Sequence, residues 1–127
     1  MCRQMAQAIA RDAEGSSKLI SIAVSGAAIE IDARKVGISV ANSSLVKTAA
    51  FGNDPNWGRT LCAMGYAGVE FDTRAVCVSL CGTEVYGNGS GIEFDERILS
   101  EAMQQDDVRI DIFLAEGSSG AEVFTCD

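Results

Sequence analysis

The sequence predicts an α+β fold, in which helices pack on one face of a mostly antiparallel sheet. Two patterns carry this prediction. Branched and alternating apolar residues mark strands over 18–25, 75–81 and 108–114. Elsewhere apolar residues recur every three or four positions, as on the buried side of a helix. A chain of 127 residues is expected to form a single domain over 1–127.

The first third of the chain is predicted as helix, strand and helix. The first helix begins at residue 1 and ends at Gly15, and the strand over 18–25 ends at Gly26. The second helix covers 29–41. Its buried side is predicted to carry Ile29, Ala33, Val36 and Val40.

The middle of the chain contains its only proline and its only tryptophan. Residues 45–51 are predicted as a strand. A third helix is predicted to open at Asp54-Pro55 and to end near Met64. An aspartate side chain accepts hydrogen bonds from the first helical turn, and proline suits the first helical position because it has no N–H group to leave unpaired.

The last third is predicted as strands separated by turns and one helix. The strand over 75–81 turns at Gly82-Thr83. The segment 87–91 is predicted to be a second turn rather than a phosphate loop, because no helix opens on its glycines. A short helix over 95–103 should bury three of its residues. The strand over 108–114 should form a hairpin with 121–126. The three residues predicted to point inward from the helix are Ile98, Leu99 and Ala102.

Composition and charge narrow the function. The net charge of −8 argues against a nucleic-acid partner, since phosphate binding needs clustered lysine and arginine. The sequence has no apolar run of about 18 residues and no signal-peptide core, which predicts no membrane span and a cytoplasmic protein. The five cysteines are odd in number and irregularly spaced, and are expected to be free and mostly buried thiols.

The residue types exclude several kinds of catalytic site. The sequence has no histidine, so neither a Ser-His-Asp nor a Cys-His arrangement can be built from this chain alone. Its acidic residues are scattered, which favours solvated charge over a metal site. We therefore expect no metal site and no histidine-based catalytic site among these side chains.

Two polar segments are candidates for function. The segment over 12–18 carries two acids, two hydroxyls and a lysine, although a helix end followed by a polar loop explains it as well. The segment over 53–59 also has a structural interpretation, which local chemistry favours. In it Asp54 caps and Pro55 starts a helix, Trp57 packs, Gly58 permits close approach and Arg59 pairs with an acid.

The same segments carry a resemblance to a known family. Residues 11–19, Arg-Asp-Ala-Glu-Gly-Ser-Ser-Lys-Leu, resemble the Arg-Asp-Gly-Glu-Gly-Ala-Thr-Lys motif of the glutamate N-acetyltransferase (ornithine acetyltransferase) family of arginine biosynthesis. Residues 45–49 and 51–59 are similar to the second motif of that family nearly residue for residue. Residues 108–111 and 125–127 resemble its C-terminal landmarks. The resemblance covers the whole chain in order.

The resemblance implies an N-terminal-nucleophile type of fold and chemistry. Members are cut before a threonine, which becomes the first residue of the β chain. This threonine takes the acetyl group from N2-acetyl-L-ornithine and passes it to L-glutamate. Some members also accept acetyl-CoA, and no other cofactor is implied. The free α-amino group can act as the base, which agrees with the absence of histidine.

The resemblance also implies which parts are supplied elsewhere. The chain corresponds to the C-terminal portion of the β chain, truncated at both ends, because the nucleophilic threonine and the last strand of the family have no counterpart in it. The oxyanion donors belong to the α chain. Partners are therefore the α chain and the remaining β-chain segments in an α2β2 heterotetramer. By position, Glu14 matches a substrate-contacting glutamate that faces the cationic end of ornithine or an active-site lysine.

The sequence departs from the family motif at three positions, and two alternative functions stand beside the one that the resemblance implies. Ala13 stands where the family has glycine, and Ser16-Ser17 replace Ala-Thr, which affects substrate preference more than family membership. One alternative is an aminopeptidase of the same N-terminal-nucleophile architecture. The other is a non-catalytic module that binds small amino acids or mediates assembly.

Overall fold

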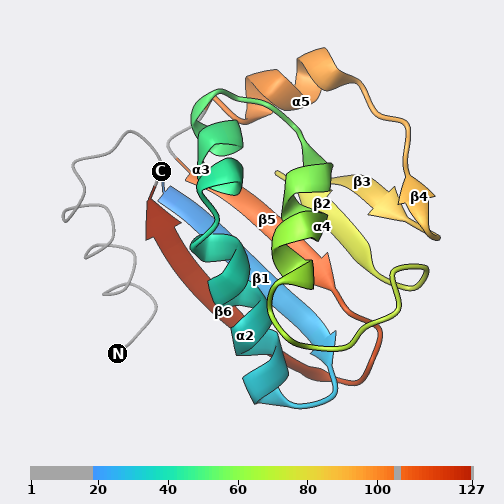
Figure 1. Ribbon diagram of the computed structural model, residues 1–127. Helices are drawn as coiled ribbons and strands as arrows, with labels where there is room; N and C mark the ends of the chain where they lie inside the picture. Colours follow the sequence, from blue (N-terminus) through green and yellow to red (C-terminus); the bar gives the residue numbers. More distant parts are fainter. Residues whose placement is uncertain (1–18, 105–106, 127) are drawn as a thin grey trace.

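The computed structural model describes residues 19–104 and 107–126, and the predicted first helix lies outside these residues. The described part forms two layers (Figure 1), with helices α2, α3 and α4 lying across one face of a six-stranded sheet. Helix α5 lies beyond one end of the strands (Figure 1). None of the helices in this part of the chain is long and apolar enough to cross a membrane.

The described strands run in the order β4-β3-β2-β5-β1-β6 across the sheet. Only β1 and β5 pair in parallel, and the four other pairs are antiparallel. The predicted α+β class with a mostly antiparallel sheet is therefore confirmed. The strands are β1 Leu19–Ala27, β2 Cys77–Leu80, β3 Thr83–Gly87, β4 Ser90–Gly91, β5 Asp107–Phe113 and β6 Ser119–Cys126.

Strand β1 lies between β5 and β6, so the predicted hairpin of 108–114 with 121–126 is wrong. After β5 the chain passes around the end of β1, where the N–H groups of Glu116 and Gly117 both donate to the carbonyl oxygen of Gly26 at 2.6 and 2.8 Å. A Cβ atom on Gly117 would lie 2.6 Å from the carbonyl oxygen of Ala27. Glycine at this position lets the connection approach β1 closely enough to place β6 on its far side.

The alternating strands bury the side chains that the pattern predicts. Val76, Val78 and Leu80 are buried while the residues between them are not, and the same holds along 108–114. Both hairpin turns have two residues with positive φ, which are 51° at Cys81 with 83° at Gly82, and 53° at Asn88 with 81° at Gly89. Such turns match the twist of the strands they join. The interpretation of 87–91 as a turn is confirmed.

Helix α3, Ser44–Phe51, occupies the segment that was predicted as a strand, and that prediction is wrong. The Ser43 side chain accepts a hydrogen bond from the N–H group of Val46 at 3.3 Å, which caps the helix. Val46, Ala49 and Ala50 then fall on one helical face and are buried. The cap and this three-to-four-residue spacing outweigh the branched residues that suggested a strand.

Helix α2, Glu30–Ala41, confirms the predicted second helix, and α5, Glu96–Ala102, confirms the predicted short helix. Asp95 caps α5, since its side chain accepts hydrogen bonds from the N–H groups of Arg97 and Ile98. The predicted inward positions are partly wrong. Ile29 precedes α2 and Ile98 faces outward from α5, with exposed fractions of 52% and 64%.

Helix α4, Trp57–Gly65, begins later than predicted. Asp54 and Pro55 belong to a turn, in which the N–H group of Asn56 donates to the Asp54 carbonyl oxygen at 2.8 Å. Asn56 occupies the cap position, and its side chain makes no capping hydrogen bond. The helix is instead held at its start by the packing of Trp57, described below.

Candidate functional site

The two segments that the sequence indicates for function differ in what the structure shows. Glu14 and the polar loop over 12–18 lie outside the described residues. The segment over 51–59 runs from the last residue of α3 into the first turn of α4 and is described completely. The candidate site is therefore built from this segment and from the helices that it joins.

Trp57 packs where the helical layer meets the β3–β4 hairpin. Its ring lies 5.2 Å from that of Tyr86 between centroids, tilted by 39°. A Cβ atom on Gly91 would lie only 2.5 Å from Trp57 Cζ2, so the indole covers the backbone of β4. The Tyr86 hydroxyl donates to the Thr73 carbonyl oxygen at 2.7 Å, which fixes the opposite edge of this aromatic pair. The predicted packing role of Trp57 is confirmed.

The turn before Trp57 connects three helices. Asn53 has a φ of 55°, and the Asp54 N–H group donates to the carbonyl oxygen of Ala49 in α3 at 2.9 Å. The hydroxyl of Ser100 in α5 donates to the Asn53 carbonyl oxygen at 2.8 Å. Asparagine tolerates this left-handed conformation better than most residues. The turn therefore holds α3, α4 and α5 in fixed positions.

Within residues 19–104 and 107–126, Arg59 forms no ion pair with an acid, contrary to the structural interpretation of the sequence. Its Nη1 group donates to the carbonyl oxygen of Leu45 in the first turn of α3 at 3.0 Å. A Cβ atom on Gly58 would meet only the Asn56 side chain, at 3.3 Å, so close approach by another element does not explain this glycine. A carbonyl oxygen is neutral, and the positive charge of Arg59 therefore persists beside α3.

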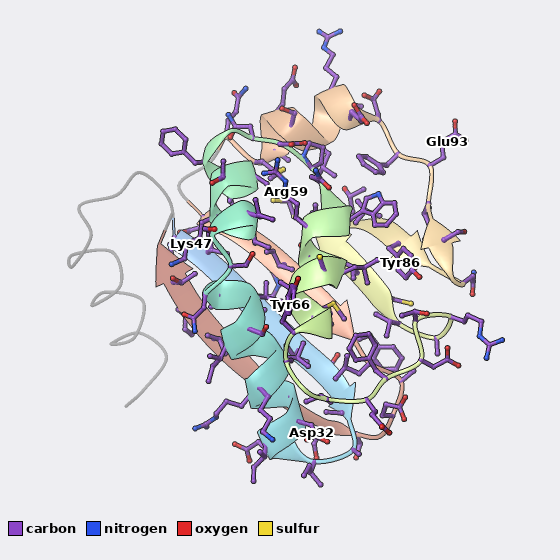
Figure 2. The ribbon with its side chains drawn as sticks, in the orientation of Figure 1. Asp32, Lys47, Arg59, Tyr66, Tyr86 and Glu93 are labelled. Atoms are coloured by element: carbon purple, nitrogen blue, oxygen red, sulfur yellow. The ribbon has the colours of Figure 1, made fainter. Side chains whose placement is uncertain are left out.

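A groove of about 650 Å³ opens between α2, α3 and α4. Its volume is within the range of small-molecule sites. Arg59 lies at the upper end of α4 and Tyr66 follows its lower end (Figure 2). The hydroxyl of Ser39 in α2 donates to the carbonyl oxygen of Ala63 in α4 at 2.6 Å, which ties the helices together beneath the groove.

The described residues that line the groove combine apolar side chains with two cationic ones. Ile38, Leu45 and Tyr66 supply exposed apolar surface, while Lys35 and Arg59 supply the charges. No acidic residue is among the described residues that line it, although the chain carries 18 acids against 10 lysines and arginines. Sequence reasoning missed this site. One feature of the sequence could have indicated this site. Ile38 stands one helical turn after Lys35, so the exposed side of α2 carries an apolar residue beside a charged one.

The face of the sheet opposite the helices carries the C-terminal landmark. Arg109 Nε lies 3.0 and 3.1 Å from the two carboxylate oxygens of Asp111, next to it on the same face of β5. The hydrogen bond and the charge of Asp111 raise the pKa of Arg109, with a smaller contribution from Glu122. This pair is partly exposed and contributes at most about 1 kcal/mol to stability. We assign Arg109 and Asp111 a structural role.

Cys62, Cys77 and Cys81 are free, and the expectation of mostly buried thiols is wrong for these three. Cys62 is exposed, while Cys77 and Cys81 are half-buried. Burial raises the pKa of the Cys77 thiol, and the neighbouring Glu84 carboxylate raises it further. Within the described part of the chain, no three cysteine, aspartate or glutamate side chains gather in a way that could hold a metal ion.

Together these features define a class: a two-layer α+β domain whose helical layer is joined to the sheet through a tryptophan-centred turn. Comparisons with known proteins identify the family to which this domain belongs. The ArgJ family matches residues 1–127, and the chain belongs to this family.

Individual proteins that are similar to this chain are also ArgJ proteins. The arginine biosynthesis bifunctional protein ArgJ of Staphylococcus aureus is 43% identical over 127 residues, covering 100% of the chain and 31% of that protein. Its Thermus thermophilus counterpart is 40% identical, with 33% of its length covered. The crystal structure of Bacillus halodurans ArgJ superposes with a TM-score of 0.94 at 35% identity, over 99% of this chain and 60% of that one. The chain thus spans about a third of the length of the curated relatives it matches.

The contact between Trp57 and β4 generates a stability prediction. Gly91→Ala should lower the free energy of unfolding by about 1–3 kcal/mol, because the added methyl group overlaps the indole. Gly65→Ala is the matched control, since a Cβ atom there meets nothing within 4 Å. It should leave stability unchanged or raise it by up to about 1 kcal/mol. Urea denaturation measures both, and equal effects would contradict the proposed contact.

The thiols generate a second prediction. Since the thiolate is the nucleophile, the raised pKa of Cys77 should make its alkylation by iodoacetamide at pH 8 slower than that of the exposed Cys62. Peptide mapping by mass spectrometry follows each site separately. Glu84→Gln removes one cause of the shift, so it should lower the pKa of Cys77 and speed its alkylation. An unchanged rate at Cys77 in that variant would refute the role of Glu84.

Proposed function

We propose that this chain is part of an acetyltransferase of arginine biosynthesis, which moves an acetyl group from N2-acetyl-L-ornithine to L-glutamate. The observation that supports this most strongly is membership of the ArgJ family over residues 1–127. The relatives named arginine biosynthesis bifunctional protein ArgJ match the whole length of the chain at about 40% identity. The proposal extends to the complete protein, of which the chain represents one portion.

The proposed reaction proceeds through an acetyl-threonyl intermediate. A threonine hydroxyl supplied outside these 127 residues attacks the acetyl carbonyl of N2-acetyl-L-ornithine, and the amide nitrogen leaves as the α-amine of ornithine. The α-amine of glutamate then attacks the ester and releases the threonine. The α-amino group of the threonine acts as the base, so no histidine is required. Acetyl-CoA would serve as an alternative donor.

The proposed contribution of this chain is substrate binding. We assign no catalytic residue to it and assign Glu14 to the cationic end of ornithine, since a carboxylate forms a charge-assisted hydrogen bond with an ammonium group. The α chain and the other β-chain segments complete the site in an α2β2 assembly in the cytoplasm. Fixed positions of α3, α4 and α5 would give this part of the site a rigid wall.

The test is acetyl transfer by the complete protein. Glu14→Gln should lower kcat/KM for N2-acetyl-L-ornithine by about 10–100-fold, the loss expected for one hydrogen bond to a charged group. Glu70→Gln changes the same charge at an exposed position and should leave kcat/KM unchanged. Unchanged kinetics in Glu14→Gln would refute its assignment. Hydrolysis of peptides in place of acetyl transfer would favour the aminopeptidase alternative.

A further inference from the structure

The groove between α2, α3 and α4 has a positive charge at each end. Helices α2 and α4 run in opposite directions (Figure 1), and the hydroxyl of Ser39 in α2 donates to the carbonyl oxygen of Ala63 in α4. Lys35 precedes Ser39 by one helical turn and Arg59 precedes Ala63 by one turn, so the two cations lie toward opposite ends of the groove. Lys35 and Asn42 both line the groove seven residues apart, a distance of about 10 Å along the helix. The two cationic side chains therefore flank an apolar middle formed by Ile38 and Ala63.

Both positive charges are available to a ligand. Lys35 is exposed and forms no ion pair with a carboxylate in the described part of the chain. Arg59 uses one of its N–H groups on the Leu45 carbonyl oxygen, and a guanidinium group has five N–H donors. Unpaired cations are notable here because acids outnumber lysines and arginines by 18 to 10.

The residues that line the groove also indicate that a ligand without an ammonium group fits best. Among the described residues that line the groove, none carries a carboxylate that could pair with an ammonium group. A free amino acid would place its ammonium group near two cations, with only neutral side chains such as Ser39 and Asn42 beside it among the described lining residues, and like charges repel. An acylated amino acid carries a neutral amide there, and its acyl group can lie against Ile38 and Tyr66.

We propose that this groove binds a small dicarboxylate that has no ammonium group, with its carboxylates directed to Lys35 and Arg59. The identity of this dicarboxylate rests on the proposed function. The product of the proposed reaction is an N-acylated acidic amino acid, N-acetyl-L-glutamate, and we infer that it is the ligand. The groove would then distinguish the product from the acceptor L-glutamate by the acetyl group alone.

The experiment is a titration of the purified chain with N-acetyl-L-glutamate at low salt, followed by backbone amide NMR shifts. We expect saturable shifts at Ile38, Leu45 and Tyr66. L-Glutamate adds the ammonium group and N-acetyl-L-glutamine removes one carboxylate, so each should bind at least about tenfold more weakly. Equal responses to the three compounds, or no saturable shift at these residues, would overturn the proposal.

Variants test the two cations separately. Lys35→Met and Arg59→Met should each weaken binding by about tenfold or more. Arg97→Met is the matched control, because Arg97 pairs with Glu101 on α5 and does not line the groove. The Lys35 side chain makes no hydrogen bond within the described part of the chain, so Lys35→Met stays informative if Arg59→Met, which loses the bond to Leu45, unfolds the protein. An equal loss of affinity in Arg97→Met would mean unspecific charge attraction and would overturn the proposal.

The proposal and the proposed function can fail separately. Binding is measured without turnover, whereas the function is measured as acetyl transfer by the complete protein. Saturable binding with no acetyl transfer would refute the proposed function and retain a dicarboxylate site. Normal transfer without saturable binding would refute the groove site and retain the function.

Discussion

The turn between α3 and α4 is the constraint on which the helical layer depends. Its backbone is bound on one side to α3, through Ala49, and on the other to α5, through Ser100. Trp57 follows at once and packs on Tyr86 and on the backbone of β4. Helices α3 and α5 and strands β3 and β4 therefore all contact the five residues 53–57. These contacts give residues 53–57 a structural role, although the described residues show no catalytic geometry there.

The groove is a consequence of the same turn. Trp57 sets where α4 begins, and Arg59, two residues later, reaches back to the Leu45 carbonyl oxygen. The spacing between α3 and α4 is thereby fixed while one cation remains directed at the groove. A site built on helices held in this way is more rigid than one built on loops, which suits discrimination between small ligands that differ by one acyl group.

The sequence predicted what depends on local periodicity and missed what depends on distant partners. Alternation identified the buried positions of β2 and β5 because each strand has one covered face. The pairing of β6 with β1 could not be predicted, since it depends on how the chain passes Gly26. The motif around Trp57 was recognisable, but the partner of Arg59 is a backbone carbonyl, which no side-chain pattern reveals. The groove arises only where three helices meet.

The most direct test of this account is amide hydrogen exchange in the wild-type chain and in Trp57→Leu. If Trp57 joins the two layers, protection should fall together in α4, β3 and β4, while β1, β5 and β6 retain theirs. Leucine keeps an apolar side chain but removes the ring that covers β4. Unchanged protection in the hairpin, or an equal loss across every strand, would contradict the central role of this turn.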